Sequence, residues 1–433
     1  MSTHPPESEA QIASDGGEQQ QTSPILRLSD DILAEIFRAI VAAARPAHLR
    51  ALCALSAVCM DWRRVAHGTP LLWREIYIRG LRSIQRFADR LKLHLRHAGN
   101  VALVLDVNIA VQLPWVPRAQ FTSDILDRLL RQAKRWKRAT LVLDPGHIAH
   151  IVQSFATFPA LERLSLTVVG QNACPPPGIP LYSSRALRHV HLRFETVLGD
   201  AITGIPWRQL QTVKLSSARP DDINTILGLL PADAHLWLDA CTMTGTIATQ
   251  TNIAGLFLDN CHSSLVASIL QFVVAPGLKR FVVRGSQPDH IPAFLARSAC
   301  ALRHLGIQLS PWSPLARTTA FLAGDSARGV TSFEVFNAGK ELLAILRALG
   351  DDAGVLPMLR TLRIPVGPKP MTAEMEVALE GVCEGRRGTL CVLEQVLSTK
   401  EVRPRIVQYN PSPAPPPKFD LGRMRALVGE WGA

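Results

Sequence analysis

The 433-residue sequence contains no apolar run long enough to cross a membrane. Its longest nearly apolar stretch, residues 265–278, is shorter than the roughly 18 residues that suggest a spanning helix. Residues 1–24 are polar and contain no apolar segment, so they do not form a signal peptide, and we expect a disordered leader there. We therefore expect a protein without a membrane-spanning helix.

Motifs of catalysis and of metal binding are also missing. The eight cysteines include no C-x-x-C pair, which favours reduced thiols and a cytoplasmic or nuclear location. No nucleophile elbow, Walker loop or dinucleotide fingerprint occurs. His147 and His150 lie one helical turn apart without a third ligand, and His189 and His191 share a strand face without a partner set. We therefore expect no enzyme, no metal and no cofactor.

The composition that remains is that of a folded chain. Hydrophobic residues make up 47% and charged residues 19%, and the net charge of +11 is spread along the whole length. A generally basic surface is the simplest interpretation of this charge, although it leaves an acidic partner or nucleic acid possible. The length allows two or three domains or one elongated array.

The first organised segment is predicted to contain three short helices. Ser29 is a favourable N-cap with Asp30 and Asp31 in the first turn, and an apolar stripe follows. A second helix is expected from His48 to about Val58, and a third passes through Trp62. A turn then leads to Trp73. Three helices in about fifty residues cannot bury so many large apolar side chains, so this segment is expected to dock on a partner.

These residues resemble an F-box. The resemblance lies in Leu28-Ser29-Asp30-Asp31-Ile32, in Val58-Cys59-Met60-Asp61-Trp62-Arg63 and in Pro70-Leu71-Leu72-Trp73, and it covers residues 26–75. Ser29 replaces the usual proline, and VAAARPAH lengthens the first connection between helices. The resemblance implies binding to a Skp-family adaptor and, through it, to a cullin–RING ubiquitin ligase. The residues expected in the F-box core and on its adaptor face are Leu28, Ile32, Ile36, Phe37, Val58, Trp62 and Trp73.

Two basic stretches follow the F-box-like segment. Residues 76–99 are expected to form a linking amphipathic helix with a solvated basic face. The cations of residues 131–138 are expected at the end of another helix, where they would favour its dipole. In the first stretch nucleic-acid or lipid binding is the weaker interpretation, because interleaved aromatic residues are lacking, and the helix end is sufficient to explain the second.

A short alternating phrase then recurs nine times, from residues 161–166 to residues 359–364, at steps of 20 to 29 residues. Similar alternations occur at residues 101–107 and 139–145, and helical patterns separate the phrases. The pattern resembles degenerate leucine-rich repeats. We therefore predict an α/β fold in which a small three-helix F-box precedes an irregular leucine-rich-repeat-like α/β solenoid over residues 100–400, with a Pro-rich tail at 401–433. An ordinary doubly wound α/β domain is the alternative.

If the apolar frame of each phrase faces the core, the residue between its last two apolar positions faces the opposite, concave side. Trp237 and Phe257 then become neighbours flanked by cations, which is typical of a binding hot spot. A covered face or a slipped register is the alternative. The concave row is Ser165, His191, Lys214, Trp237, Phe257, Val282, Gly306, Glu334 and Arg363, and the candidate substrate-binding residues are His191, Lys214, Trp237, Phe257, Arg280 and Arg284. Cys241 and Cys261, each at the end of a phrase, are expected to be buried fillers.

The resemblance and the repeats together predict a non-catalytic, substrate-recruiting subunit of a Skp–cullin–F-box ubiquitin ligase, whose repeats hold an unknown protein target. Two other functions stay open. One is a scaffold that binds the adaptor without directing degradation, and the other is a basic protein associated with nucleic acid.

Overall fold

A computed structural model describes most of the chain. The described residues are 28–44, 47–79, 84–110, 119–169, 178, 180–194, 204–241, 247–285, 290–308, 315–336, 340–366, 372–386, 392–397 and 405–408. The expected leader at 1–24 and most of the expected Pro-rich tail lie outside these residues. The chain divides into two compact units, Met1–Arg74 with Leu93–Gly99 and Glu75–Lys92 with Asn100–Ala433, and each is described by itself.

The first unit contains the three predicted helices. They are α1 (Asp30–Ala43), α2 (His48–Val58) and α3 (Met60–Gly68), followed by the short 3-10 helix η2 (Pro70–Trp73). Ser29 is extended, and its carbonyl accepts the N–H of Leu33 at 3.0 Å, although its hydroxyl makes no cap bond. The Cys59 sulfur accepts the N–H of Trp62 at 3.5 Å and so begins α3. The expected helices are confirmed.

The core of this unit is built from one face of each helix. Leu33, Phe37 and Val41 recur every four residues along α1 and are buried, as are Leu52 of α2 and Val65 of α3. The last turns of α4 (Ile84–His97) also belong to this unit. There the rings of His94 and His97 lie 5.4 and 4.7 Å from the ring of Trp73, whose N–H donates to the Ala66 carbonyl at 2.7 Å.

The second unit is built on one sheet of fourteen strands that follow one another in sequence order. Strands β1 to β13 pair in parallel, and β14 pairs with β13 antiparallel. The strands are β1 (Glu75–Arg79), β2 (Leu103–Asn108), β3 (Trp136–Leu143), β4 (Arg163–Val168), β5 (His189–Phe194), β6 (Thr212–Ser216), β7 (His235–Asp239), β8 (Gly255–Asp259), β9 (Arg280–Val283), β10 (His304–Gln308), β11 (Ser332–Phe336), β12 (Thr361–Val366), β13 (Val392–Leu397) and β14 (Arg405–Gln408).

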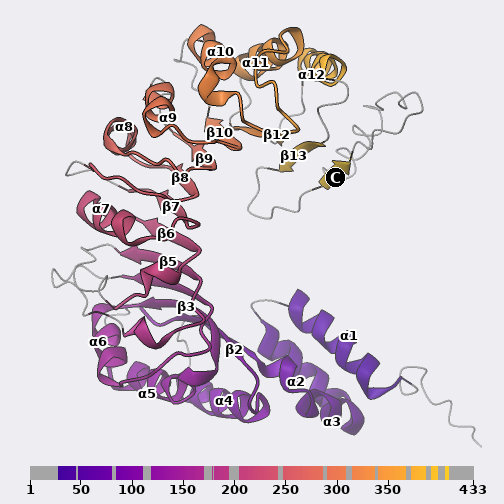
Figure 1. The fold of residues 1–433 in the computed structure, drawn as a ribbon. Coiled ribbons are helices and arrows are strands. Elements are labelled where there is room, and N and C mark those ends of the chain that lie inside the picture. The colour runs from indigo at the N-terminus through magenta and orange to yellow at the C-terminus, as the bar shows by residue number, and fades with distance from the viewer. Residues whose placement is uncertain are drawn as a thin grey trace, which may run out of the picture. The chain divides into compact units, whose positions relative to one another are not determined.

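Helices cover one face of this sheet (Figure 1). They are α5 (Ala119–Leu130), α6 (Pro145–Gln153), α7 (Pro220–Leu229), α8 (Ser263–Phe272), α9 (Ile291–Ser298), α10 (Leu315–Ala323), α11 (Lys340–Asp351) and α12 (Ala373–Gly385). The described parts of the connections around β5 contain the short 3-10 helices η4 (Leu181–Ser183) and η6 (Trp207–Gln209). The mixed α/β class is confirmed, and none of the described helices is long and apolar enough to span a membrane.

Burial alternates along the strands, as the phrases predict. In β7, Leu236 and Leu238 are fully buried on the helix-covered side, whereas His235, Trp237 and Asp239 are partly exposed on the other side. We call this other side the open face. All nine phrases and the two earlier alternations lie in β2 to β12, so the predicted strands are confirmed.

Two helix predictions are wrong at their ends. The expected helix at 76–99 begins only at Ile84, because Ile76 and Ile78 alternate with polar residues and are buried when β1 pairs with β2. Residues 131–138 do not end the expected α-helix, although Lys134 and Arg135 lie in the 3-10 helix η3 (Ala133–Arg135). Helix α5 stops at Leu130, and β3 begins at Trp136, which is only 1% exposed. Its indole N–H donates to the Leu129 carbonyl at 3.1 Å, which leaves the following cations on a strand.

Besides β1 and the short 3-10 helices, four described elements have no counterpart in the sequence prediction. They are α10, α12, β13 and β14, and β14 lies inside the range that was expected to hold only the Pro-rich tail.

Candidate functional site: two interaction surfaces

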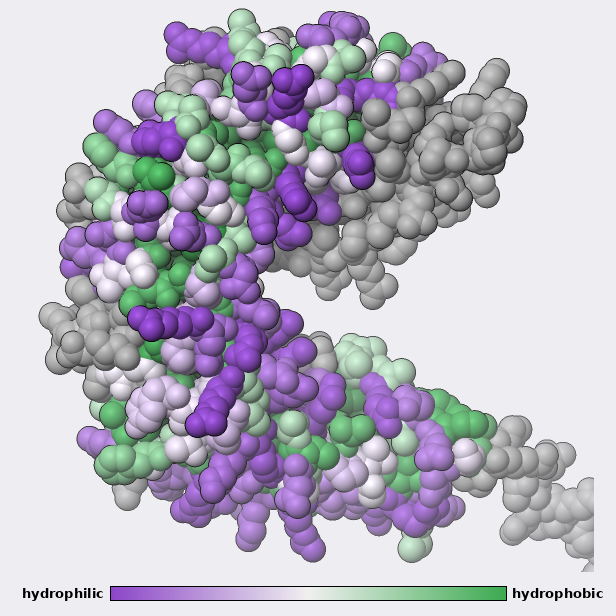
Figure 2. Space-filling view, viewed as in Figure 1, coloured by the Kyte–Doolittle hydropathy of each residue, from purple (hydrophilic) through white to green (hydrophobic). Residues whose placement is uncertain are grey.

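Apolar side chains remain exposed on the three-helix unit. Ile32 is 50%, Val58 60% and Met60 83% exposed, and Ile40 and Leu71 are also exposed. Hydrophobic residues are visible on the surface of α1 (Figure 2). The unit therefore presents apolar surface after its own core is filled, which is typical of a protein interaction site.

The predicted F-box residues separate into three groups. Ile32 and Val58 are exposed, whereas Leu28, Ile36 and Trp62 are partly buried. Phe37 and Trp73 are 0% and 1% exposed, so they form the core and do not reach a partner directly. The Phe37 and Trp62 rings lie 5.0 Å apart, which links the surface residue to the core.

Polar contacts fix the relative positions of the helices in this unit. Arg64 of α3 pairs with Asp30 at the start of α1, with 3.0 Å between Nη2 and Oδ1, and this hydrogen bond lowers the pKa of Asp30. The Arg63 Nε donates to the Ser56 carbonyl at 2.9 Å, which ties α3 to α2. Exposed Ile32 and Val58 are therefore held on a defined scaffold.

On the second unit, the predicted concave row lies along the open face in continuous register. Each residue is the register partner of the next on the neighbouring strand. At its centre, the rings of Trp237 and Phe257 stack 3.9 Å apart at an interplanar angle of 10°. Both rings are partly exposed. The two strands thus place a flat aromatic surface on the open face, which we call the aromatic pair.

The cations expected beside the aromatic pair differ in their surroundings. Lys214 Nζ lies 2.9 Å from Asp239 Oδ2. Arg284 lies 3.4 Å from Asp259 and stacks 3.9 Å over the Phe336 ring. Arg280 is exposed at the start of β9. Lys214 and Arg284 are therefore already paired, and Arg280 is the more accessible cation.

His191 belongs to a hydrogen-bonded chain across β4 to β7. Its Nδ1 lies 3.2 Å from Ser165 Oγ and its Nε2 3.1 Å from Ser216 Oγ, which in turn lies 3.4 Å from Asp239 Oδ2. Burial, Lys214 and Arg193 lower the pKa of His191, and Asp239 opposes them. The imidazole bonds two hydroxyls and no carboxylate, so a Ser–His–Asp catalytic arrangement is not assembled at His191.

The absence of a side chain at Gly255 leaves space for the His235 ring beside the aromatic pair. A Cβ on Gly255 would lie 2.1 Å from His235 Nδ1 and 2.9 Å from the Phe257 ring. The His235 ring therefore occupies the space over Gly255, 6.0 Å from the Trp237 ring. Burial and the charge of Arg280 lower the pKa of His235, and Asp233 opposes them. The imidazole of His235 thus lies beside the aromatic pair, and its lowered pKa favours the neutral form.

Cys241 and Cys261 are 1% and 6% exposed, as expected of buried fillers. Their thiols donate to the carbonyls of Leu215 at 3.7 Å and Leu238 at 3.3 Å. The contact with Cys241, together with burial, raises the pKa of Cys261 far above its usual range. An inert, protonated thiol suits a structural position at the end of a strand.

The His147 and His150 pair does not form a shared site. His147 Nδ1 lies 2.9 Å from Asp144, and His150 Nε2 lies 2.6 Å from Asp127. Within the described ranges, no group of three such ligands is arranged to hold a metal ion.

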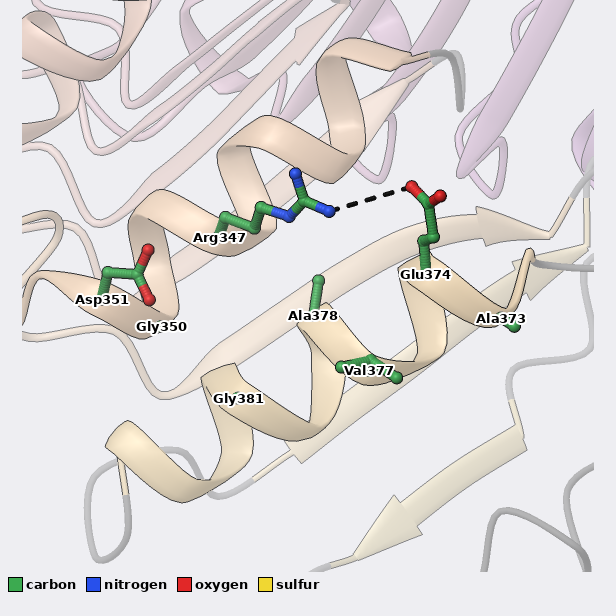
Figure 3. Close-up of a pocket in the computed structure, with 8 residues that line it drawn as sticks. All are labelled: Arg347, Gly350, Asp351, Ala373, Glu374, Val377, Ala378 and Gly381. Carbon is green, nitrogen blue, oxygen red and sulfur yellow. Dashed lines mark ion pairs between the residues drawn. The ribbon is translucent and has the colours of Figure 1, made fainter.

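A shallow pocket lies between α11 and α12 (Figure 3). Arg347 and Glu374 face each other across it, 3.8 Å apart. The absence of a side chain at Gly385 allows the helices to approach closely, because a Cβ there would lie 2.6 Å from the Gly350 carbonyl oxygen. The lining is small and mostly apolar, which is typical of helix packing rather than of a reactive site.

Comparison with known proteins identifies the domain that carries the first surface. A family model described as F-box-like matches residues 26–79. Residues 26–79 thus carry an F-box-like domain, which confirms this part of the sequence prediction. No curated protein matches the chain. Domains of this kind bind Skp-family adaptors, so the exposed apolar residues belong to a domain with a partner-binding role.

Proposed function

We propose that this protein is a substrate-recruiting F-box subunit of a Skp–cullin–F-box ubiquitin ligase. The observation that carries the proposal is the F-box-like match over residues 26–79, on a helical unit that exposes Ile32, Val58 and Met60. Through these residues the unit would bind a Skp-family adaptor, and the adaptor would bring the cullin. Burial of exposed apolar surface would provide most of the binding free energy.

The second unit would hold the target protein on its open face. Sequential strand order and helices on one face support a leucine-rich-repeat-like solenoid, because a doubly wound domain places helices on both faces and reverses its strand order (Figure 1). The candidate target-binding residues are those of the predicted set, His191, Lys214, Trp237, Phe257, Arg280 and Arg284.

In this role the chain performs no chemistry. It would hold a target near the ubiquitin carrier and so raise the effective concentration of the target's lysines. A scaffold without degradative function would bind the same adaptor. The two functions differ in one observable, namely whether cullin and ubiquitinated target are recovered with the chain.

Binding of purified adaptor to the full chain tests the proposal. Val58→Asp places a charge on a side chain that is 60% exposed, and we expect it to weaken adaptor binding by about 2–4 kcal/mol while leaving the fold intact. Val377→Asp is the matched control, because Val377 of α12 is 67% exposed and lies outside the F-box-like domain.

Trp62→Ala should also weaken adaptor binding, but its contact with Phe37 means that helix stability must be measured alongside. Equal adaptor binding by Val58→Asp, Val377→Asp and the parent would refute the assigned surface. Recovery of the adaptor without cullin would favour the scaffold.

A further inference from the structure

Two arginines and a histidine stand side by side on the open face, next to His191 of the residues proposed above. Arg138 of β3 is the register partner of Arg163 of β4, which is the partner of His189 of β5. Arg138 and Arg163 are exposed, and His189 is partly exposed. We call these three residues the cationic row. Hydrophilic residues gather where β3 to β6 reach the surface in Figure 2.

Such an arrangement is unfavourable in the chain alone, because like charges directly opposite each other on neighbouring strands repel. Other cations nearby have acidic partners. Lys137 lies 3.3 Å from Glu162, and Lys214 lies 2.9 Å from Asp239. Within the described part of the chain, no ion pair or hydrogen bond engages the guanidinium groups of Arg138 and Arg163. The row thus lacks a counterion that its neighbours possess.

The charges of the two arginines also affect the imidazole of His189. Burial lowers the pKa of His189, and the charges of Arg163 and Arg138 lower it further, while Glu162 opposes them. The next residues along β3 and β4 on the same face are Thr140, whose hydroxyl can donate a hydrogen bond, and Ser165, whose hydroxyl lies 3.2 Å from His191 Nδ1 and can also accept or donate there. Two guanidinium groups beside two hydroxyls suit a carboxylate or a phosphate ester.

The cationic row lies a short way across the sheet from the aromatic pair. From β4 to the midpoint between β7 and β8 there are three and a half strand spacings, or about 17 Å. An extended peptide covers about 17 Å in about five residues. Thr212 and Lys214 of β6 lie between, and the Lys214 charge is already paired with Asp239. One extended segment can therefore reach both features.

We propose that the open face binds an acidic peptide segment whose anionic group contacts Arg138 and Arg163 and whose aromatic or aliphatic side chain, about five residues away, packs on Trp237 and Phe257. The proposal rests on the function proposed above, in which this face holds the target, and it adds the chemical class of the target. The anionic group is either a cluster of Asp and Glu or a phosphoserine.

Fluorescence anisotropy with the full chain and synthetic peptides tests this proposal. The probe carries an Asp-Glu-Glu triad and a phenylalanine two, five or eight positions away, so that one, four or seven Gly/Ser residues lie between them, in both orders. Parallel probes replace the triad with Ser-Ser-Ser or with one phosphoserine. We expect the five-residue spacing to bind at least tenfold more tightly than the neutral peptide, and the phosphoserine arm to identify which anion is preferred.

The double variant Arg138→Gln/Arg163→Gln should lose at least tenfold in affinity for the acidic probe. Arg208→Gln/Arg219→Gln is the matched control, because it removes the same charge from two exposed arginines outside the strands and should bind like the parent. Trp237→Ala should reduce the affinity for the five-residue spacing toward that for the other spacings.

Three outcomes would overturn the proposal. The first is equal loss in the double variant and its control, which would indicate general charge attraction. The second is stronger competition by a single-stranded RNA than by the unlabelled peptide, with a steep dependence on salt. The third is no binding of any acidic probe while adaptor binding persists and the chain captures a ubiquitinated target. That third result would leave the proposed function standing. If instead the unmodified chain did not bind the adaptor, the proposed function itself would be contradicted.

Discussion

Arg386 provides the sharpest test of how the second unit is held together. This residue directly follows α12 and is only 4% exposed. Its Nε donates to the Leu349 carbonyl at 3.0 Å and its Nη1 to the Leu356 carbonyl at 2.7 Å. Its Nη2 donates to the carbonyls of Val355 and Asp352. One guanidinium thus donates hydrogen bonds to backbone carbonyls at the end of α11 and in the segment that leads to β12.

The charge is retained in this setting. Burial lowers the pKa of Arg386 and the nearby Asp352 opposes that shift, but an arginine side chain remains protonated at neutral pH. The carbonyls at the C-terminal end of α11 carry partial negative charge, which favours a cation there. Removal of the guanidinium takes away its hydrogen bonds to these carbonyls, although the Asp352 and Leu356 carbonyls keep the backbone N–H donors of Val355 and Leu359.

The expected magnitude follows from these contacts. A hydrogen bond to a charged group contributes about 1.5–3 kcal/mol, but the guanidinium regains hydration on unfolding, so the separate values do not add. Leaving a buried acceptor without its donor costs about 1–3 kcal/mol. We expect Arg386→Met to lose about that much free energy of unfolding. Arg386→Lys should lose about half as much, because a single ammonium group cannot donate to all of the carbonyls that the guanidinium contacts.

Chemical denaturation and hydrogen exchange measure this effect. Each strand and helix in such an array contacts mainly its neighbours, so faster exchange should concentrate in α11, α12 and β12 and leave β4 to β8 unchanged. Arg360→Met is the control, because Arg360 is exposed just before β12. If Arg386→Met and Arg360→Met unfold alike and exchange alike, the capping role of Arg386 is refuted.

Two further predictions follow from the titratable groups. In the folded protein, iodoacetamide at pH 8 should modify exposed Cys53 and spare buried Cys241 and Cys261. Cys383, whose pKa burial and the charges of Glu380 and Glu384 raise to about 11, should react slowly. Rapid alkylation of Cys241 would contradict its packing. The pKa values of His189, His191 and His235 are lowered in the fold, so the unfolded chain binds their protons more tightly. Stability should be constant above the unfolded pKa near 6.5 and fall as the pH drops below it. Denaturation at pH 7.5 and 5.5 measures this, and His191→Asn should reduce the difference; an unchanged difference would exclude His191 as a contributor.

Local patterns in the sequence were sufficient for the three helices of the first unit and for strands β2 to β12 of the second. Helix α2 spans His48–Val58, the range that apolar spacing predicted, and the alternating phrases became strands in the expected frame. The register of Trp237 beside Phe257 also followed from the phrases, because side chains alternate between the faces of a strand with a period of two. Patterns of this kind depend only on residues close in the chain.

The tertiary structure decided which apolar residues are buried and which cations are paired. Ile32 and Phe37 belong to one apolar stripe in the sequence, yet Ile32 is 50% exposed and Phe37 is fully buried. Arg138 was expected at a helix end, but the burial of Trp136 places Arg138 on a strand beside Arg163. Sequence periodicity identifies the face of an element. The segment that covers this face is chosen by packing between residues far apart in the chain, and only the folded structure shows that choice.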